Sequence, residues 1–386
     1  MEKKTVLPVY MAVAFVWFTT QFGGGFASGR QIIDYFVSYG WYAIFTPILV
    51  QLIQAFILYY VFKLSFEKQL FDYRQFTDEL YGKTRTFMSP IYEFGYNFAL
   101  CLATAVAFAT GGSTLTHLTG IPYLASTLII AVAMFLLTIF GANLVRKAAT
   151  VVSILIIVGM LGIFIPNIIY FMPTLKENYA QLQANSTAVG PALWKMTLYA
   201  AFQVLAIGAY VGHAVAFNSL GEIKKSMAWG FVINTVIIML AVFGVIAVYN
   251  VPGIMTESVP NLIMVQSGVG GAFLTPVISI LILVGSLSTG VNFIFGIVGR
   301  IVNVMGKDET EAVQVAKQRS RSIKVSLFYV ALTFSIAQFG LIPLVAKGYS
   351  YLGYISIFVV IIPILILWVK DISGNRTTKE SIGGRI

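Results

Sequence analysis

Residues 22 to 30 read Phe-Gly-Gly-Gly-Phe-Ala-Ser-Gly-Arg, which places four glycines and a positive charge inside the first apolar stretch of the chain. Each glycine costs a helix about 1 kcal/mol relative to alanine. Backbone groups that a broken helix frees in hydrocarbon cost several kcal/mol more, unless they line a cavity. This run therefore predicts a lined cavity that binds a ligand. Its candidate substrate-binding residues are Gly23, Gly24, Gly25, Phe26, Ala27 and Arg30.

A second glycine-interrupted apolar stretch follows about 185 residues later, at 206 to 213. Its candidate substrate contacts are Gly208, Tyr210 and His213, and the aromatic side chains of Tyr96 and Phe202 could complete a site. The competing interpretation is structural. Glycine is common where membrane helices pack closely, aromatics at helical spacing usually pack, and a histidine in an apolar helix can be a hydrogen-bonded packing residue.

Few charged side chains lie at membrane depth. Arg30 and Asp34 are four residues apart, so a helix places them on one face as a neutralising pair. We take this pair as structural first, with a substrate or gating role for Arg30 second. Glu93 is either interfacial or a proton or cation ligand.

The composition indicates which kind of structure carries these residues. With 58% hydrophobic and 10% charged residues, the chain is an integral membrane protein. Apolar runs of roughly 20 residues predict an all-α fold of ten transmembrane helices. We place them at 6–37, 42–65, 89–116, 122–143, 148–170, 195–220, 227–250, 272–300, 325–342 and 351–369.

Lysine and arginine set the predicted orientation. If the N-terminus is cytoplasmic, nearly all of them fall on the cytoplasmic side, and only Lys176, Lys195 and Lys347 lie outside. We therefore expect a multi-pass plasma-membrane protein with both termini cytoplasmic. The net charge of +10 is explained by these loops without nucleic acid. The loop 251–271 is apolar enough to form an extracellular lid.

The two interrupted helices are the first and the sixth of the ten. Five is odd, so two equivalent halves have opposite topologies, which predicts a 5+5 inverted repeat with discontinuous helices 1 and 6. We expect one transporter domain over 1–370, with repeats at about 6–170 and 195–369, and a cytoplasmic tail at 371–386. The break in helix 1 offers carbonyls to a cation near Phe22 and N–H groups to an anion near Phe26. A zwitterion such as an amino acid has both charges.

The motif from Gly23 to Gly29 resembles the G-A-G-F-A-S-G signature of YkvI-like bacterial membrane proteins, within the amino acid/polyamine/organocation transporter superfamily. Gly24 stands where that signature has alanine. The resemblance implies a LeuT-like fold with substrate held between helices 1, 3, 6 and 8.

In sodium-coupled members of that group, two adjacent hydroxyls of helix 8 hold the ion together with backbone carbonyls. Ser288 and Thr289 match this pattern, and the resemblance implies oxygen atoms of Thr19, Phe22 and Gly285 as the other ligands. Oxygen ligands suit a hard cation. The competing interpretation is that both hydroxyls bond their own helix or join two helices.

Some proton-coupled relatives use a lysine of helix 5 in place of sodium. The nearest candidate in this chain is Lys147, which beside Arg146 reads as a cytoplasmic anchor. The sequence therefore favours a sodium-coupled symporter of a small organic solute, an amino acid or related zwitterion. A proton-coupled transporter and a non-transporting membrane sensor are the alternatives. No catalytic motif or cofactor site is evident, so we expect no enzyme, and the sequence leaves the oligomeric state open.

Overall fold

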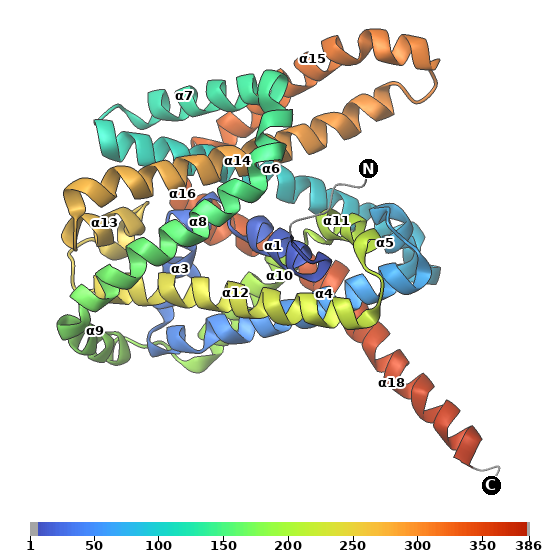
Figure 1. Ribbon diagram of the computed structural model, residues 1–386, viewed down its shortest axis with the longest axis horizontal. Coiled ribbons are helices and arrows are strands. Elements are labelled where there is room, and N and C mark those ends of the chain that lie inside the picture. Colours follow the sequence, from blue (N-terminus) through green and yellow to red (C-terminus); the bar gives the residue numbers. More distant parts are fainter. Residues whose placement is uncertain (1–6, 384–386) are drawn as a thin grey trace.

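The structure is a computed structural model that describes the backbone of residues 7–383 and the side chains of 7–140 and 154–373. Helices and the turns between them make up this part of the chain, and no strand occurs in it. This agrees with the apolar composition, because helices satisfy all their backbone hydrogen bonds internally in lipid. Figure 1 shows them as one elongated bundle.

The described residues 7–184 contain nine α-helices. They are α1 (Val9–Gln21), α2 (Gly24–Ala27), α3 (Arg30–Tyr35), α4 (Thr46–Lys68), α5 (Tyr73–Tyr81), α6 (Arg85–Thr119), α7 (Tyr123–Leu136), α8 (Ala142–Tyr170) and α9 (Met172–Ala184). A π-helical turn, η4 (Leu137–Gly141), joins α7 to α8.

The second half repeats the broken start. Its helices are α10 (Val189–Val204), α11 (Ile207–Tyr210), α12 (Leu220–Ala247), α13 (Pro260–Ser267), α14 (Gly271–Met305), α15 (Glu311–Ala337), α16 (Leu341–Pro343), α17 (Tyr349–Ser356) and α18 (Ile362–Gly383). The short turns η5 (Val211–Ala216) and η6 (Ile254–Thr256) follow α11 and α12.

Six helices of the described residues are long and apolar enough to cross a membrane, or eight if each of two bent pairs counts as one span. The two remaining predicted spans correspond to the short pieces α1 to α3 and to the apolar second half of α15, whose first half is charged. The multi-pass architecture is thus supported, while ten spans and a 5+5 repeat remain predictions.

The bundle has two distinct ends. We call the end with α9, α13 and η6 the lid end, and the end with α5 and the α14–α15 connection the basic end. In Figure 1 the lid end lies on the left and the basic end on the right. The sequence predicts that the lid end is extracellular. The long helix α6 packs along α14 through the centre, and α14 also contacts α2 and α8.

Two segments between the predicted spans are largely helical. The segment after α8 turns by 84° and continues as α9. The charged stretch 302–324 is divided between the end of α14 and the beginning of α15, with a short turn between them. Buried polar contacts made by these segments, such as the bonds from Asn178 to the end of α12, carry no simple sequence pattern.

Candidate functional site

The first span is interrupted between α1 and α2, as the glycine run predicts. The N–H of Gly23 donates to the Gln21 carbonyl at 2.9 Å, and that of Phe26 donates to Gly23 at 3.0 Å. In a continuous helix these N–H groups would bond the carbonyls four residues earlier, on Thr19 and Phe22. The break therefore leaves the carbonyls of Thr19 and Phe22 without their helical donors.

The glycines of this run allow close approaches. Gly29 has a φ of +86°, and a Cβ there would lie 2.5 Å from Oδ1 of Asn261. At Gly24 a Cβ would lie 2.7 Å from Oγ1 of Thr110 on α6. Glycine is required at Gly29 by conformation and space together, whereas Gly24 lets α2 reach the central helix.

The second break lies between α10 and α11. The hydroxyl of Tyr92, from α6, sits in it: this oxygen accepts from the N–H of Gly208 at 2.9 Å and donates to the carbonyl of Leu205 at 3.2 Å. One tyrosine thus satisfies one donor and one acceptor of the broken helix. Gly208 is needed for this approach, because a Cβ there would lie 3.0 Å from the Tyr92 hydroxyl.

The face of α14 toward the first break carries Ser288 and Thr289. Many hydroxyls in the bundle bond a carbonyl of their own helix; on α14 itself, Ser279 donates to Thr275 at 2.7 Å. Neither the Ser288 nor the Thr289 hydroxyl makes such a bond or any other hydrogen bond within the described chain. The idea that they merely satisfy their own helix is therefore not supported for these two side chains.

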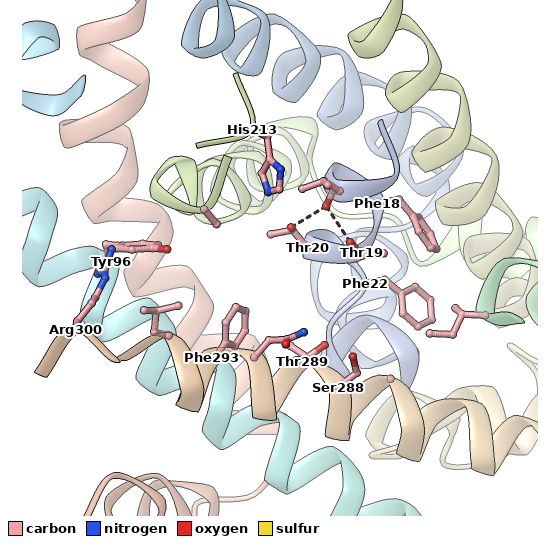
Figure 2. A pocket seen from close by; sticks show the side chains of 17 residues that line it. Phe18, Thr19, Thr20, Phe22, Tyr96, His213, Ser288, Thr289, Phe293 and Arg300 are labelled. Atoms are coloured by element: carbon pink, nitrogen blue, oxygen red, sulfur yellow. Dashed lines mark hydrogen bonds between the residues drawn. The ribbon is translucent and has the colours of Figure 1, made fainter. Parts of the chain in front are cut away.

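Two adjoining cavities lie between the breaks and α14. The larger, of about 300 Å³, is bordered along α14 from Gly285 to Arg300 and reaches toward the basic end. The smaller, of about 70 Å³, lies beside the α1–α2 break. Tyr96, Thr289 and Phe293 line both cavities, so these form neighbouring parts of one site. Figure 2 shows Ser288 and Thr289 facing Phe22, with Arg300 next to Tyr96.

All five predicted ion ligands and several predicted substrate contacts line these cavities. The larger cavity is lined by Thr19, Phe22, Gly285, Ser288, Thr289, Tyr96 and His213. The smaller is lined by Gly23, Gly24, Phe202, Tyr96 and Thr289.

Other predicted substrate contacts lie elsewhere. Tyr210 packs in a separate apolar cluster with Trp17 and Phe62, and Gly208 faces Tyr92. The remaining four, Gly25, Phe26, Ala27 and Arg30, are buried without lining either cavity. Their burial follows from the packing of α2 and α3 against the lid, which a sequence pattern does not reveal.

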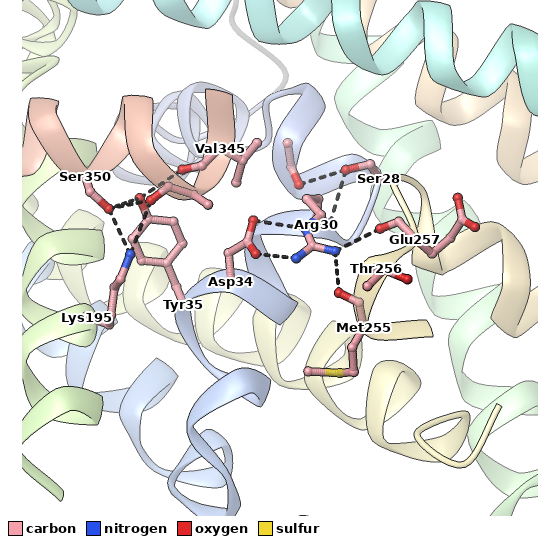
Figure 3. A network of polar contacts seen from close by, with 12 residues as sticks. Ser28, Arg30, Asp34, Tyr35, Lys195, Met255, Thr256, Glu257, Val345 and Ser350 are labelled. Carbon is pink, nitrogen blue, oxygen red and sulfur yellow. Dashed lines mark hydrogen bonds and ion pairs between the residues drawn. The ribbon is translucent and has the colours of Figure 1, made fainter. Parts of the chain in front are cut away.

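Arg30 belongs to a network at the lid end. Its guanidinium pairs with Asp34 and donates through Nη1 to the carbonyls of Met255 at 2.8 Å and Glu257 at 3.0 Å. Asn261 adds a bond from Nδ2 to the Ala27 carbonyl at 2.9 Å. Figure 3 shows the Arg30 contacts, which join the segment of η6 to α3. The Asn261 bond joins α13 to α2. The pair predicted from i, i+4 spacing thus forms, and it also holds the lid.

Glu93, the remaining charged candidate, lines neither cavity. Glu93 bonds Arg74 at 3.1 Å and accepts from the Tyr73 hydroxyl at 2.9 Å, which fits the interfacial interpretation. The side chain of Lys147, the residue considered for proton coupling, lies outside the described residues.

Sequence reasoning missed several cavity residues. Three glutamines, Gln21, Gln31 and Gln203, line the smaller cavity, and Asn292 and Arg300 line the larger. Asn292, Gly296 and Arg300 follow Gly285, Ser288 and Thr289 at three- and four-residue spacing, so they share one helix face. That spacing was a readable signal. The sequence instead predicts Arg300 as the last residue of a span, at its cytoplasmic end.

Comparison with known proteins supports the fold. No protein-family model and no curated protein matches this chain. A sodium-coupled sialic acid symporter, solved substrate-bound and outward-open, matches with a TM-score of 0.61 at 14% identity, covering 92% of this chain and 79% of its own. A manganese transporter variant from Eremococcus coleocola matches with a TM-score of 0.50 at 13% identity, covering 96% and 90%. The chain therefore has a fold found in transporters, and these solved structures are not of enzymes.

Proposed function

We propose that this protein is a secondary active transporter that couples sodium to the movement of a small organic solute, an amino acid or a related zwitterion, by alternating access. The observation that carries this proposal is the meeting of Ser288 and Thr289 with the broken end of α1 in one cavity. Two unbonded hydroxyls and two carbonyls released from helical bonding supply the hard oxygen ligands that sodium prefers.

The ion site explains how binding could couple to a conformational change. Its ligands come from α1 and α14, so a bound ion ties the broken helix to a continuous one. Loss of the ion frees the α1–α2 break to move relative to α14. A sodium ion that moves down 100 mV releases about 2.3 kcal/mol, which is enough to drive useful solute accumulation.

The cavities also fit an alternating-access cycle. The larger cavity reaches toward the basic end, whereas the Arg30 network covers the lid end. With the predicted orientation, this arrangement corresponds to a state closed toward the outside. The sodium-coupled symporter that shares the fold was solved outward-open, and we infer that this chain passes through such a state when the lid segment releases α3.

Uptake by purified protein in proteoliposomes tests the proposal. Radiolabelled amino acids and organic acids are supplied with an imposed inward sodium gradient, with an equal potassium gradient, and with a proton gradient. We expect accumulation only with sodium.

The other outcomes distinguish the alternatives. Accumulation driven by a proton gradient without sodium would identify the proton as the coupling ion. His213, which lines the larger cavity, is then the titratable group to test first. Binding of solutes without any uptake would identify a sensor instead.

A further inference from the structure

Arg300 stands out among the arginines of the bundle. Its guanidinium lies over the rings of Tyr73, at 4.3 Å, and Tyr96, at 4.7 Å. Arg30, Arg74 and Arg321 each pair with a carboxylate. The Arg300 side chain makes no ion pair or hydrogen bond with any part of the chain that the structure describes, and its Nη1 atom is buried.

This environment suits a bound anion. A guanidinium carries five N–H donors in one plane. Here two tyrosine rings, whose centroids are 6.0 Å apart, lie on adjacent sides of it, and its donors have no partner among the described residues. The side chain is half-buried, and a buried donor such as its Nη1 is costly when it has no partner. A carboxylate satisfies the edge with two parallel hydrogen bonds, a geometry that arginine favours.

The charges around the cavities point the same way. Among the described residues, Arg300 is the only permanently charged one that lines either cavity, and none of the lining residues is an aspartate or glutamate. The carboxylate of Glu93 lies near Tyr73 but is already bonded to Tyr73 and Arg74. The cavity therefore has an unbalanced positive charge, which a bound sodium ion would increase.

We propose that Arg300 forms a carboxylate-binding subsite at the basic end of the larger cavity, and that the solute is an organic acid with an aromatic or apolar body. This rests on the proposed sodium-coupled transport of a small organic solute and assigns that solute as an anion in place of the zwitterion. The body would lie against Phe18, Phe22, Leu100 and Phe293, which line the same cavity.

The position of the subsite changes the expected direction of the solute. Arg300 follows Thr289 by eleven residues on α14, or about 16 Å along the helix axis. The carboxylate thus points toward the basic end, away from the four-residue helix α2 to which the sequence had assigned it. The subsite lies on the path by which a solute would leave the central site.

Binding to purified protein in detergent tests this without any gradient. Thermal stabilisation is measured at fixed sodium with L-phenyllactate, an anion, L-phenylalanine, a zwitterion, and L-phenylalaninamide, a cation. We expect phenyllactate to stabilise most. Arg300→Gln should raise its half-saturating concentration about tenfold or more, since a hydrogen-bonded charge is lost. Arg300→Lys should give a smaller loss, because a lysine retains the charge without the fork.

Arg85→Gln provides the matched control, since it removes an exposed arginine from the start of α6. It should leave phenyllactate binding unchanged. The subsite is overturned if phenyllactate does not stabilise the protein. It is also overturned if Arg300→Gln and Arg300→Lys both bind phenyllactate as tightly as the unmodified protein does. Anion binding that depends on Arg300 in a protein without sodium-driven uptake would reject the transport proposal alone. Sodium-driven uptake with no effect of Arg300 would reject the subsite alone.

Discussion

At the scale of single residues, Ser288 and Thr289 are notable because neither hydroxyl makes a hydrogen bond to any described residue. We predict that Ser288→Ala combined with Thr289→Val raises the sodium concentration for half-maximal uptake about tenfold or more, because two oxygen ligands are lost and each factor of ten corresponds to about 1.4 kcal/mol. Ser279→Ala is the matched control, since Ser279 lies on the same helix and bonds its own backbone. Unchanged sodium dependence in the double variant would remove the ion site.

Gly29 makes a second prediction at this scale. Gly29 has a φ of +86°, which side-chain-bearing residues rarely adopt. A Cβ at this position would also lie only 2.5 Å from Oδ1 of Asn261, so there is no room for a side chain. We expect Gly29→Ala to destabilise the folded protein by about 1–3 kcal/mol, the usual cost of forcing a residue into a disfavoured conformation. Thermal unfolding in detergent measures this. Gly162→Ala, where a Cβ would meet open space within α8, should not destabilise.

At the scale of elements, hydrogen bonds hold the lid segment of η6 and α13 to α2 and α3. Arg30 donates two of them, to the carbonyls of Met255 and Glu257. We predict that Arg30→Gln loosens the lid, because the bonds to Met255 and Glu257 are lost and Asp34 loses its partner. To measure this, Gln31, which lines the smaller cavity beneath the lid, is replaced by cysteine. This cysteine should react faster with a membrane-impermeant maleimide when Arg30→Gln is also present. The native Cys101 is replaced by alanine in all these proteins.

Lys317→Gln serves as the control for this experiment. It removes a charge at the basic end, where Lys317 pairs with Glu309, and so should leave labelling at position 31 unchanged. Equal labelling rates with and without Arg30→Gln would show that the Arg30 contacts do not hold the lid.

The elements themselves were partly readable. The run from Gly23 to Gly25 predicted the break in the first span, because glycine disfavours helix and frees backbone groups. The second break was predicted from Gly208, but the group that satisfies it, the Tyr92 hydroxyl from α6, was not. That bond joins residues 116 positions apart, and no local pattern encodes such a pair.

At the scale of the whole molecule, the arrangement of the two ends predicts orientation. We expect the basic end to be cytoplasmic, since lysine and arginine are retained on that side. Cysteines in place of Val189, at the lid end, and Val315, at the basic end, are both exposed and can be labelled in intact cells. Labelling of the first before permeabilisation, and of the second only afterwards, is the expected result. The reverse pattern would invert the proposed direction of the cavity.

The sequence by itself determined the solvent, the helical class, the two interrupted spans and the i, i+4 pairing of Arg30 with Asp34. These depend on composition and short-range spacing, which act through hydropathy, helix propensity and neighbouring turns. Only the tertiary structure decided which faces meet. The structure shows that Arg300 lines a cavity. It also shows that Arg30 donates hydrogen bonds to the lid segment. It also left the hydroxyls of Ser288 and Thr289 facing a broken helix. Such contacts join residues far apart in the chain, so packing, and not local preference, selects them.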